Sequence, residues 1–370
     1  MSLRLTPARA ATESPIDRAL AAVTAGEPVV LVDDHAPEPA GFLVAAAESV
    51  TTRVTAFLVR HSSGLLCVSL PGSECDRLGL PPMSAAGHAP PRFEACVTVD
   101  AATGITTGIS AHDRARTAAL LASADSSGSD FTRPGHLIPV RHAAGGVLRR
   151  RGVAEAAADL ARAAGRRPAA LFAAMVGLSR PTELAAPAEL TGFAGAHGLA
   201  VVSLGDLIAH RLSLDPLVTR RATTGWPART DTMHAIGYAG AFDGAEHLAL
   251  VTGTPAGADD VPVYVHRECP AGDVPGWPRC ECRRRLDSAL TTITAEGCGI
   301  VVYLKPGSRP EEPSAPARLA EEQLLSSVAA NIVQDLGARS VRLPAGQEPH
   351  RTAFRRRGLP ARVHWFDLTP

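Results

Sequence analysis

Lysine is almost absent from this chain of 370 residues, since Lys305 is the single example, and aromatic residues make up only 4%. The formal net charge of +0 argues against a dedicated binder of nucleic acid or of membrane surfaces. The chain also has no apolar run long enough to span a membrane, and its first twenty residues contain no apolar core of a secretory signal. We therefore expect a cytoplasmic protein whose partners are neither nucleic acid nor a membrane.

A disulfide framework is not indicated either, because the seven cysteines are an odd number without framework spacing. Four of them lie scattered among apolar neighbours and are predicted to be small core residues: Cys67, Cys75, Cys96 and Cys298. A chain of this length exceeds what one hydrophobic core usually organises, so two domains are expected. We predict an α/β (α+β) fold in which each domain is a mixed sheet with flanking helices.

The remaining cysteines are concentrated in one segment, residues 265–282, where they form a Cys-x10-Cys-x-Cys array: Cys269, Cys280 and Cys282. Three thiolates that converge from one loop suit a Zn²⁺ ion with an open fourth position. A water bound at such a position becomes a nucleophile near neutral pH. The spacing alone also allows a closed structural zinc site, or reduced cysteines without a metal, and these alternatives stay open.

The domain boundaries follow from local composition. Residues 1–13 are predicted to be a flexible tail, and Ser14 with Pro15 is typical of a helix start. Residues 14–212 form the first predicted domain. Residues 213–230 contain prolines, threonines and arginines without periodicity and are interpreted as a linker. Residues 231–370 form the second predicted domain.

Residues 14–212 resemble 3,4-dihydroxy-2-butanone 4-phosphate synthase. The resemblance rests on six motifs, at residues 29–34, 60–64, 80–83, 106–114, 133–136 and 145–150. Residues 220–370 resemble GTP cyclohydrolase II through the cysteine array and the residues that precede it. The two families are often fused in this order as a bifunctional riboflavin-biosynthesis protein.

The first resemblance implies a reaction that takes ribulose 5-phosphate to 3,4-dihydroxy-2-butanone 4-phosphate and formate around a Mg²⁺ ion. It also implies a set of residues that contact the phosphorylated sugar: Arg60, His61, Thr107, Ser110, Asp113, Arg114, Arg133, His136 and Glu155. A simpler interpretation of the loop at residues 106–114 is that it only caps the helix that follows.

Several positions of the synthase chemistry depart from the family pattern, which has an Asp-Arg-Glu-Asn-Glu-Gly-Asp acid loop. Glu38 remains at the metal-binding and catalytic position of this loop, whereas Ala40 and Phe42 replace carboxylates. Val153 stands where the family has its metal-binding histidine, and Ala174 stands where it has a catalytic glutamate. Magnesium needs several oxygen ligands, and proton transfer needs an acid or base. We therefore predict impaired synthase activity, with any Mg²⁺ held through Glu38.

The second resemblance implies that the three cysteines of the array bind zinc and that Asp273 has a catalytic role. After Tyr303, however, the family has a Gln-Glu-Gly-Arg-Gly-Ile-Gly-Leu loop that holds the nucleotide, and residues 305–312 differ from it. The family segment with a catalytic aspartate and a nucleophilic arginine is missing beyond that loop. We therefore predict a shortened zinc domain with impaired turnover of GTP.

Three hypotheses follow. The chain is a riboflavin-biosynthesis protein with both activities impaired, a diverged zinc enzyme for a related phosphorylated sugar or nucleotide, or a catalytically silent ligand-binding or partner subunit. Because the family dimerises, we expect a homodimer, or a mixed dimer with an active paralogue.

Overall fold

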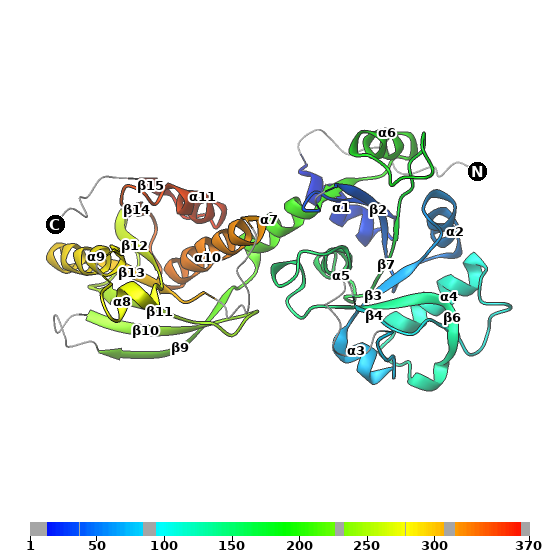
Figure 1. Ribbon diagram of the computed structural model, residues 1–370, viewed down its shortest axis with the longest axis horizontal. Coiled ribbons are helices and arrows are strands. Elements are labelled where there is room, and N and C mark those ends of the chain that lie inside the picture. The colour runs from blue at the N-terminus through cyan, green and yellow to red at the C-terminus, as the bar shows by residue number, and fades with distance from the viewer. Residues whose placement is uncertain are drawn as a thin grey trace. The chain divides into compact units, whose positions relative to one another are not determined.

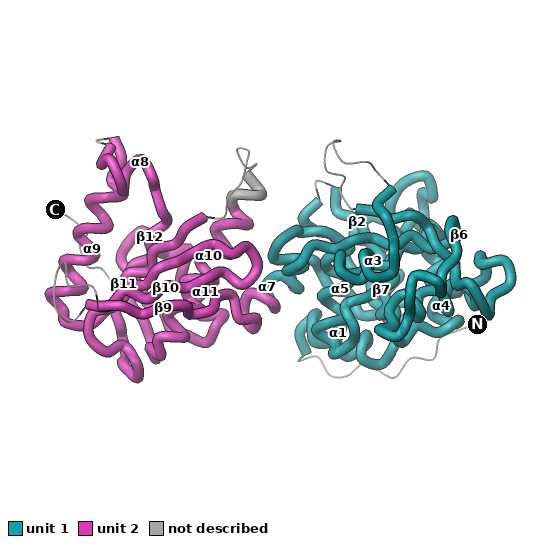
Figure 2. The backbone as a smooth tube through the Cα atoms, turned by 90° about the horizontal axis from the view of Figure 1, so that it is seen from below, with its two compact units in different colours: residues 1–210 teal, residues 211–370 magenta. Residues whose placement is uncertain are grey.

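A computed structural model describes residues 13–36, 38–83, 94–225, 233–277, 279–306 and 315–363, with the side chains of 315–318 excepted. The chain divides into two compact units, residues 1–210 and 211–370 (Figure 2). Each unit is built on a mixed sheet with helices beside it (Figure 1), which confirms the predicted fold class. Apart from Glu13, the predicted tail lies outside the described residues.

The sheet of the first unit has the strand order β4-β6-β3-β7-β2-β1-β8, and β5 pairs with β6. The strands are β1 (Val29–Asp33), β2 (Ala40–Ala46), β3 (Cys67–Pro71), β4 (Glu94–Ala95), β5 (Val99–Ala101), β6 (Phe131–His142), β7 (Ala170–Ala174) and β8 (Val201–Ser203). Strands β3 and β6 are parallel, whereas β2 and β7 are antiparallel, so the sheet is mixed.

The helices that accompany this sheet are α1 (Pro15–Thr24), α2 (Thr52–His61), α3 (Gly72–Arg77), α4 (Ala111–Ala122), α5 (Val153–Ala163), α6 (Pro187–His197) and α7 (Leu204–Leu214). Helices α1 and α5 pack against each other, and α2 packs against α4. Helix α1 starts as predicted, because the Ser14 side chain accepts a hydrogen bond from the Asp17 amide and Pro15 occupies the first turn. None of the described helices is both long enough and apolar enough to cross a membrane.

The core of the first unit lies between the sheet and these helices and includes Leu43, Leu58 and Leu171. Three of the four cysteines predicted as core residues are buried: Cys67, Cys75 and Cys96. Cys298, in the second unit, is only half-buried. Burial raises the pKa of the Cys67 thiol to about 11, as expected for an inert core cysteine.

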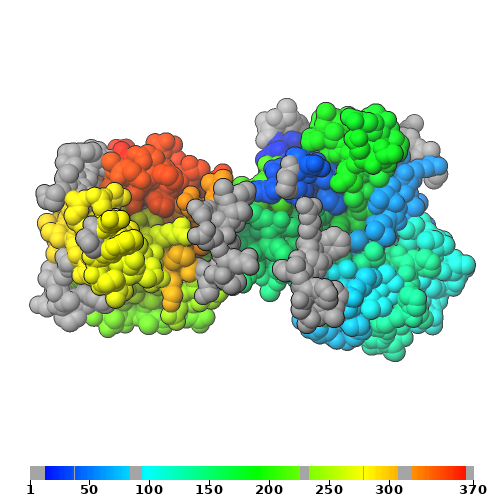
Figure 3. All heavy atoms as spheres, viewed as in Figure 1, coloured from blue at the N-terminus to red at the C-terminus, as the bar shows by residue number. Residues whose placement is uncertain are grey.

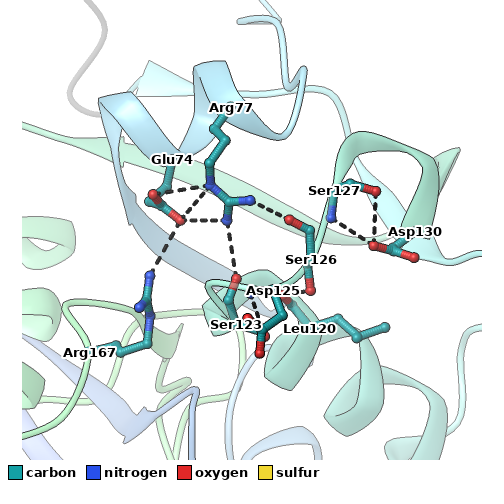
Figure 4. Close-up of polar contacts among 9 residues, drawn as sticks. All are labelled: Glu74, Arg77, Leu120, Ser123, Asp125, Ser126, Ser127, Asp130 and Arg167. Carbon is teal, nitrogen blue, oxygen red and sulfur yellow. Dashed lines mark hydrogen bonds and ion pairs between the residues drawn. The ribbon is translucent and has the colours of Figure 1, made fainter.

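A polar network fixes helix α3 at the surface of the first unit (Figure 4). The Arg77 guanidinium forms an ion pair of 2.7 Å with Glu74 and donates to the carbonyl oxygens of Ser123 and Ser126, just beyond α4. Arg167, which precedes β7, lies 3.5 Å from the same Glu74 carboxylate. Two of these contacts go to backbone carbonyl oxygens, so the network does more than pair surface charges. It joins α3 to the segment after α4 and to the segment before β7.

The sheet of the second unit has the order β15-β14-β12-β13-β11-β10-β9. Its strands are β9 (Val218–Gly225), β10 (Met233–Gly240), β11 (Glu246–Thr252), β12 (Val261–Arg267), β13 (Gly299–Leu304), β14 (Val341–Leu343) and β15 (Ala361–Val363). Its helices are α8 (Pro270–Asp273), α9 (Cys282–Glu296), α10 (Ala315–Asp335) and α11 (Glu348–Arg356). The segment interpreted as a linker, residues 213–230, contains the end of α7 and strand β9, which pairs with β10; residues 226–230 lie outside the described residues.

Two parallel central strands, β12 and β13, position the cysteine segment. His266 lies opposite Tyr303, and β12 ends one residue later. The Gln347 side chain extends the hydrogen bonding of β12, since its amide accepts from the Val265 N–H at 3.0 Å and donates to the Val265 carbonyl oxygen at 2.6 Å. Cys269 therefore lies just after the carboxyl end of β12, a buried strand that is held in place on both sides.

Candidate functional site

In the first unit, Ser110 and Asp113 hold the loop that opens α4. The Ser110 hydroxyl caps the helix by accepting the Asp113 amide at 3.1 Å. The Asp113 carboxylate is buried and accepts the Thr106 hydroxyl at 2.8 Å and the Gly108 amide at 3.1 Å. Burial alone would raise the pKa of Asp113, but these hydrogen bonds lower it below its usual range. The Thr107 side chain is exposed on this loop.

A carboxylate that the sequence interpretation missed, Asp100, lies beside this loop. Its two oxygens accept the His136 ring nitrogen Nδ1 at 2.6 Å and the His136 amide at 3.0 Å. Gly108 lies against this pair, because a Cβ at Gly108 would approach Asp100 to 2.1 Å. The buried Arg114 donates to the Gly64 carbonyl oxygen at 3.0 Å. Of the predicted residues, His136 therefore contacts Asp100 directly, whereas Asp113 holds the neighbouring Gly108.

His61, also predicted to contact the sugar, lies in a separate aromatic cluster. Its ring centroid lies 4.5 Å from that of Phe57, 5.4 Å from that of Phe193 and 4.9 Å from that of His197. Burial, followed by the charges of His197 and Arg60, lowers the pKa of His61. The neighbouring Arg60 is exposed. The cluster joins the carboxyl ends of α2 and α6.

Glu155 and Arg133 make structural contacts within the first unit. The Glu155 carboxylate is buried and accepts the Arg150 side chain at 2.6 Å and the Ala143 amide at 2.8 Å. It therefore fixes the turn that leads into α5. The Arg133 guanidinium donates to the Leu78 carbonyl oxygen at 2.8 Å.

Two of the positions that have lost a family carboxylate are direct neighbours. Phe42 on β2 lies opposite Ala174 on antiparallel β7. The Ser63 amide donates to the Ala174 carbonyl oxygen at 2.8 Å, so the loop after α2 meets the same strand end. Neither the Phe42 nor the Ala174 side chain can donate or accept a proton.

Glu38 is exposed on the loop between β1 and β2. This loop approaches the start of α5, because His35 Nδ1 lies 3.4 Å from the Arg151 guanidinium, two residues before Val153. Val153 is the first residue of α5 and has no ligand atom. Glu38 is therefore the one carboxylate retained at the positions that the resemblance assigns to Mg²⁺ binding.

The three cysteines of the array are brought together in the second unit. Their Sγ atoms lie within 4.8 Å of one another, and those of Cys269 and Cys280 are 3.6 Å apart. Cys282 is the first residue of α9. A Cβ at Gly272 would lie 2.7 Å from the Cys280 Sγ atom, so only glycine leaves space over the thiols. The segment lies at the surface of its unit (yellow in Figure 3).

The donor set fits zinc, because three sulfur ligands at this spacing match a tetrahedral site with an open position. Among the residues that the structure describes, no further histidine, cysteine or carboxylate joins the three. The hydrogen bond with Cys280 raises the pKa of Cys282 to about 12, whereas the amide and the thiol of Cys282 lower the pKa of Cys280. Three thiolates this close repel one another unless a cation lies between them.

Asp273 is buried beneath this cluster. Its carboxylate accepts the Cys269 amide at 2.8 Å, the Tyr303 hydroxyl at 2.8 Å and His266 Nε2 at 3.1 Å. Burial alone would raise the pKa of Asp273, but these three hydrogen bonds lower it. The His266 ring stacks on Tyr303 with 5.1 Å between centroids.

The fold and these two sites define a two-unit α/β protein with a polar loop cluster in one unit and, in the other, a cluster of three cysteines that could hold a metal ion. The family model for 3,4-dihydroxy-2-butanone 4-phosphate synthase matches residues 17–210, and the model for GTP cyclohydrolase II matches residues 219–362. The chain belongs to the riboflavin-biosynthesis family in which these two enzymes are joined. This confirms the resemblance.

Individual relatives agree with this assignment. The riboflavin biosynthesis protein RibBA of Rhodococcus erythropolis is 48% identical over 294 residues, which cover 78% of this chain and 69% of the relative. The crystal structure of RibBX from A. baumannii, a two-domain 3,4-dihydroxy-2-butanone 4-phosphate synthase, matches with a TM-score of 0.74 and 29% identity, covering 95% of this chain and 100% of RibBX. A synthase in complex with two magnesium ions matches with a TM-score of 0.52 and 41% identity, covering 55% and 99% of the two chains.

Proposed function

We propose that this protein is a riboflavin-biosynthesis family member in which both catalytic activities are impaired while the ligand sites are retained. The first unit would bind a phosphorylated sugar such as ribulose 5-phosphate. The second unit would bind zinc at Cys269, Cys280 and Cys282, with little or no turnover of GTP.

The observation that carries the synthase part is the apolar pair of Phe42 and Ala174 across β2 and β7. The family resemblance implies carboxylates at both positions and a metal-binding histidine at Val153. Proton transfer by a positioned side chain contributes about 10²–10⁴-fold to a rate. Losing these groups together removes both acid–base catalysis and metal ligands from one place, while the loop around Asp113 and His136 keeps its polar contacts.

For the second unit, support comes from the contrast between the retained thiols and the altered surroundings. Arg267 forms an ion pair of 2.9 Å with Glu321, so α10 is tied to the strand end beside Cys269. The family's nucleotide-binding loop and its segment with the nucleophilic arginine have no counterpart in the sequence between Tyr303 and α10. Zinc, when bound, would supply a Lewis acid at the open position.

Formate release tests both halves of the proposal. Purified full-length protein with Mg²⁺ and ribulose 5-phosphate, and separately with zinc and GTP, is expected to release formate far more slowly than an active family member measured beside it. Heat-stabilisation by ribulose 5-phosphate is expected to persist, because it reports binding without turnover. Formate release at the rate of the active relative from either substrate would contradict the corresponding half.

A second function is favoured by the intact thiol cluster. A diverged zinc enzyme would keep an open metal position and act on a related phosphorylated sugar or nucleotide, whereas a silent subunit has no need of one. A homodimer in the cytoplasm is the expected state, with a mixed dimer with an active paralogue as the alternative. Sedimentation of the chain alone and with an active paralogue distinguishes these assemblies.

A further inference from the structure

Asp273 occupies an unusual place for a residue of a zinc loop, because it contacts both halves of the cysteine array. Its carboxylate accepts the amide of Cys269, the first cysteine. Its carbonyl oxygen accepts the Arg283 guanidinium at 3.1 Å, next to Cys282, the last cysteine. The residue therefore bridges the strand side and the helix side of the site.

The same carboxylate is joined to the two central strands of the sheet. His266 on β12 and Tyr303 on β13 both contact it, and both strands are buried. The side chains of His266 and Asp273 are only 3% and 6% exposed, so these hydrogen bonds are shielded from water. A buried carboxylate held by three donors has one orientation. Because one of these donors is the Cys269 amide, the fixed carboxylate also fixes the backbone of Cys269.

We infer that Asp273 is a positioning residue for the metal: it presets the backbone of Cys269, and so its Sγ atom, before the ion binds. All three hydrogen bonds of the carboxylate are made to protein donors. The inference rests on the zinc binding proposed above. Residues that orient metal ligands typically change metal affinity by about 10–100-fold when they are replaced.

The test compares four variants of the full-length protein: Asp273→Asn, Tyr303→Phe, Cys269→Ser and Asp259→Asn. Asp259 is an exposed carboxylate that pairs with Arg339, so its variant is the matched control. Zinc affinity is measured by competition with a chelator, and folding of the metal-free proteins is checked by circular dichroism. Cobalt(II) in place of zinc adds a signature, since thiolate-to-cobalt absorption reports how many sulfurs bind and in what geometry.

We expect Asp273→Asn to bind zinc about 10–100-fold more weakly than the parent, with a cobalt spectrum shifted toward that of Cys269→Ser. Tyr303→Phe is expected to show a smaller loss, because two of the three donors remain, and Asp259→Asn should match the parent. An Asp273→Asn protein that binds zinc as tightly as the parent, or that weakens without any spectral change, overturns this inference alone. A parent protein that binds no zinc overturns the proposed function, and this inference with it.

Discussion

The two units differ in how they depart from their families. In the first unit strands β2 and β7 are paired in register, and the departures from the family pattern are single side chains, at Ala40, Phe42, Val153 and Ala174. In the second unit the three cysteines and Asp273 are kept, whereas the segments that the resemblance places around a nucleotide are replaced or missing in the sequence. Under the proposed function, synthase chemistry is lost by substitution in the first unit, and turnover of GTP is lost by deletion around the cysteine cluster in the second.

The difference between the two units determines where point mutations could restore activity. A substituted position can be restored when its backbone is still in place, as β2 and β7 are. A deleted segment cannot be restored by point mutations, because the backbone that carried its side chains is absent. The first unit is therefore the one in which activity should be recoverable.

The largest effect is expected for the zinc cysteines. Replacing Cys280 by serine removes one of three thiolates that lie within 4.8 Å, and we expect stoichiometric zinc to be lost. We expect this effect to be large because structural zinc sites in peptides bind Zn²⁺ with a free energy of about 10–16 kcal/mol at pH 7. Elemental analysis after dialysis measures the metal content. Cys298→Ser, at a half-buried cysteine outside the cluster, is the control and should keep about one zinc per chain.

Next in size is recovery of synthase activity in the first unit. The triple variant Phe42→Asp, Val153→His and Ala174→Glu restores the metal histidine and two of the three carboxylates that the resemblance implies, and we expect formate release to rise by about 10²-fold or more. The same variant with Ala174→Gln in place of Ala174→Glu controls for shape and should recover much less. If the triple variant folds but stays as slow as the parent, the proposed loss by substitution in the first unit is wrong.

The sequence predicted those features that depend on neighbours along the chain. The start of α1 followed from Ser14 and Pro15, and the convergence of the three thiols followed from three cysteines within fourteen residues. Strand β6 was missed because it contains Arg133-Pro134 and polar residues, and its strand structure depends on pairing with β3, β4 and β5. Local patterns do not encode such non-local contacts.

Two functional details needed the fold for the same reason. Asp100 contacts His136 only because β5 pairs with β6, 36 residues further along the chain. The adjacency of Phe42 and Ala174 depends on the register of β2 with β7, which no motif specifies. The identities of these residues were visible in the sequence, but their partners were not.

Glu155, which the resemblance assigns to sugar binding, is expected to support the fold of the first unit instead. Its carboxylate is 1% exposed and holds Arg150 and the Ala143 amide. Glu155→Ala leaves Arg150 Nε and the Ala143 amide without their acceptor, and we expect a loss of about 3 kcal/mol in the unfolding free energy of the first unit. Urea unfolding followed by circular dichroism measures it. Glu183→Ala, which breaks an exposed pair with Arg180, should cost less than about 1 kcal/mol.

The smallest effect concerns acid sensitivity, which should be greater in the second unit. His350 accepts or donates a hydrogen bond of 2.7 Å with Ser326, and burial lowers its pKa to about 4. A histidine whose folded pKa is depressed stays neutral in the native state while the unfolded chain takes up a proton. Its contribution to stability is therefore complete above the unfolded pKa of about 6.5 and is lost as the pH falls toward 4.

Between pH 7.5 and 5 this linkage corresponds to about 2 kcal/mol for His350 alone. Burial also lowers the pKa of His247 in the second unit, so His247 adds to the loss of stability at acid pH. In the first unit, His61 is a histidine whose pKa is lowered in the same way. Hydrogen exchange resolved by peptide should show α10 and α11 losing protection at pH 5 before β2 and β7 do. His350→Gln should reduce this difference, because glutamine does not titrate; equal loss in both units would refute the contrast in acid sensitivity.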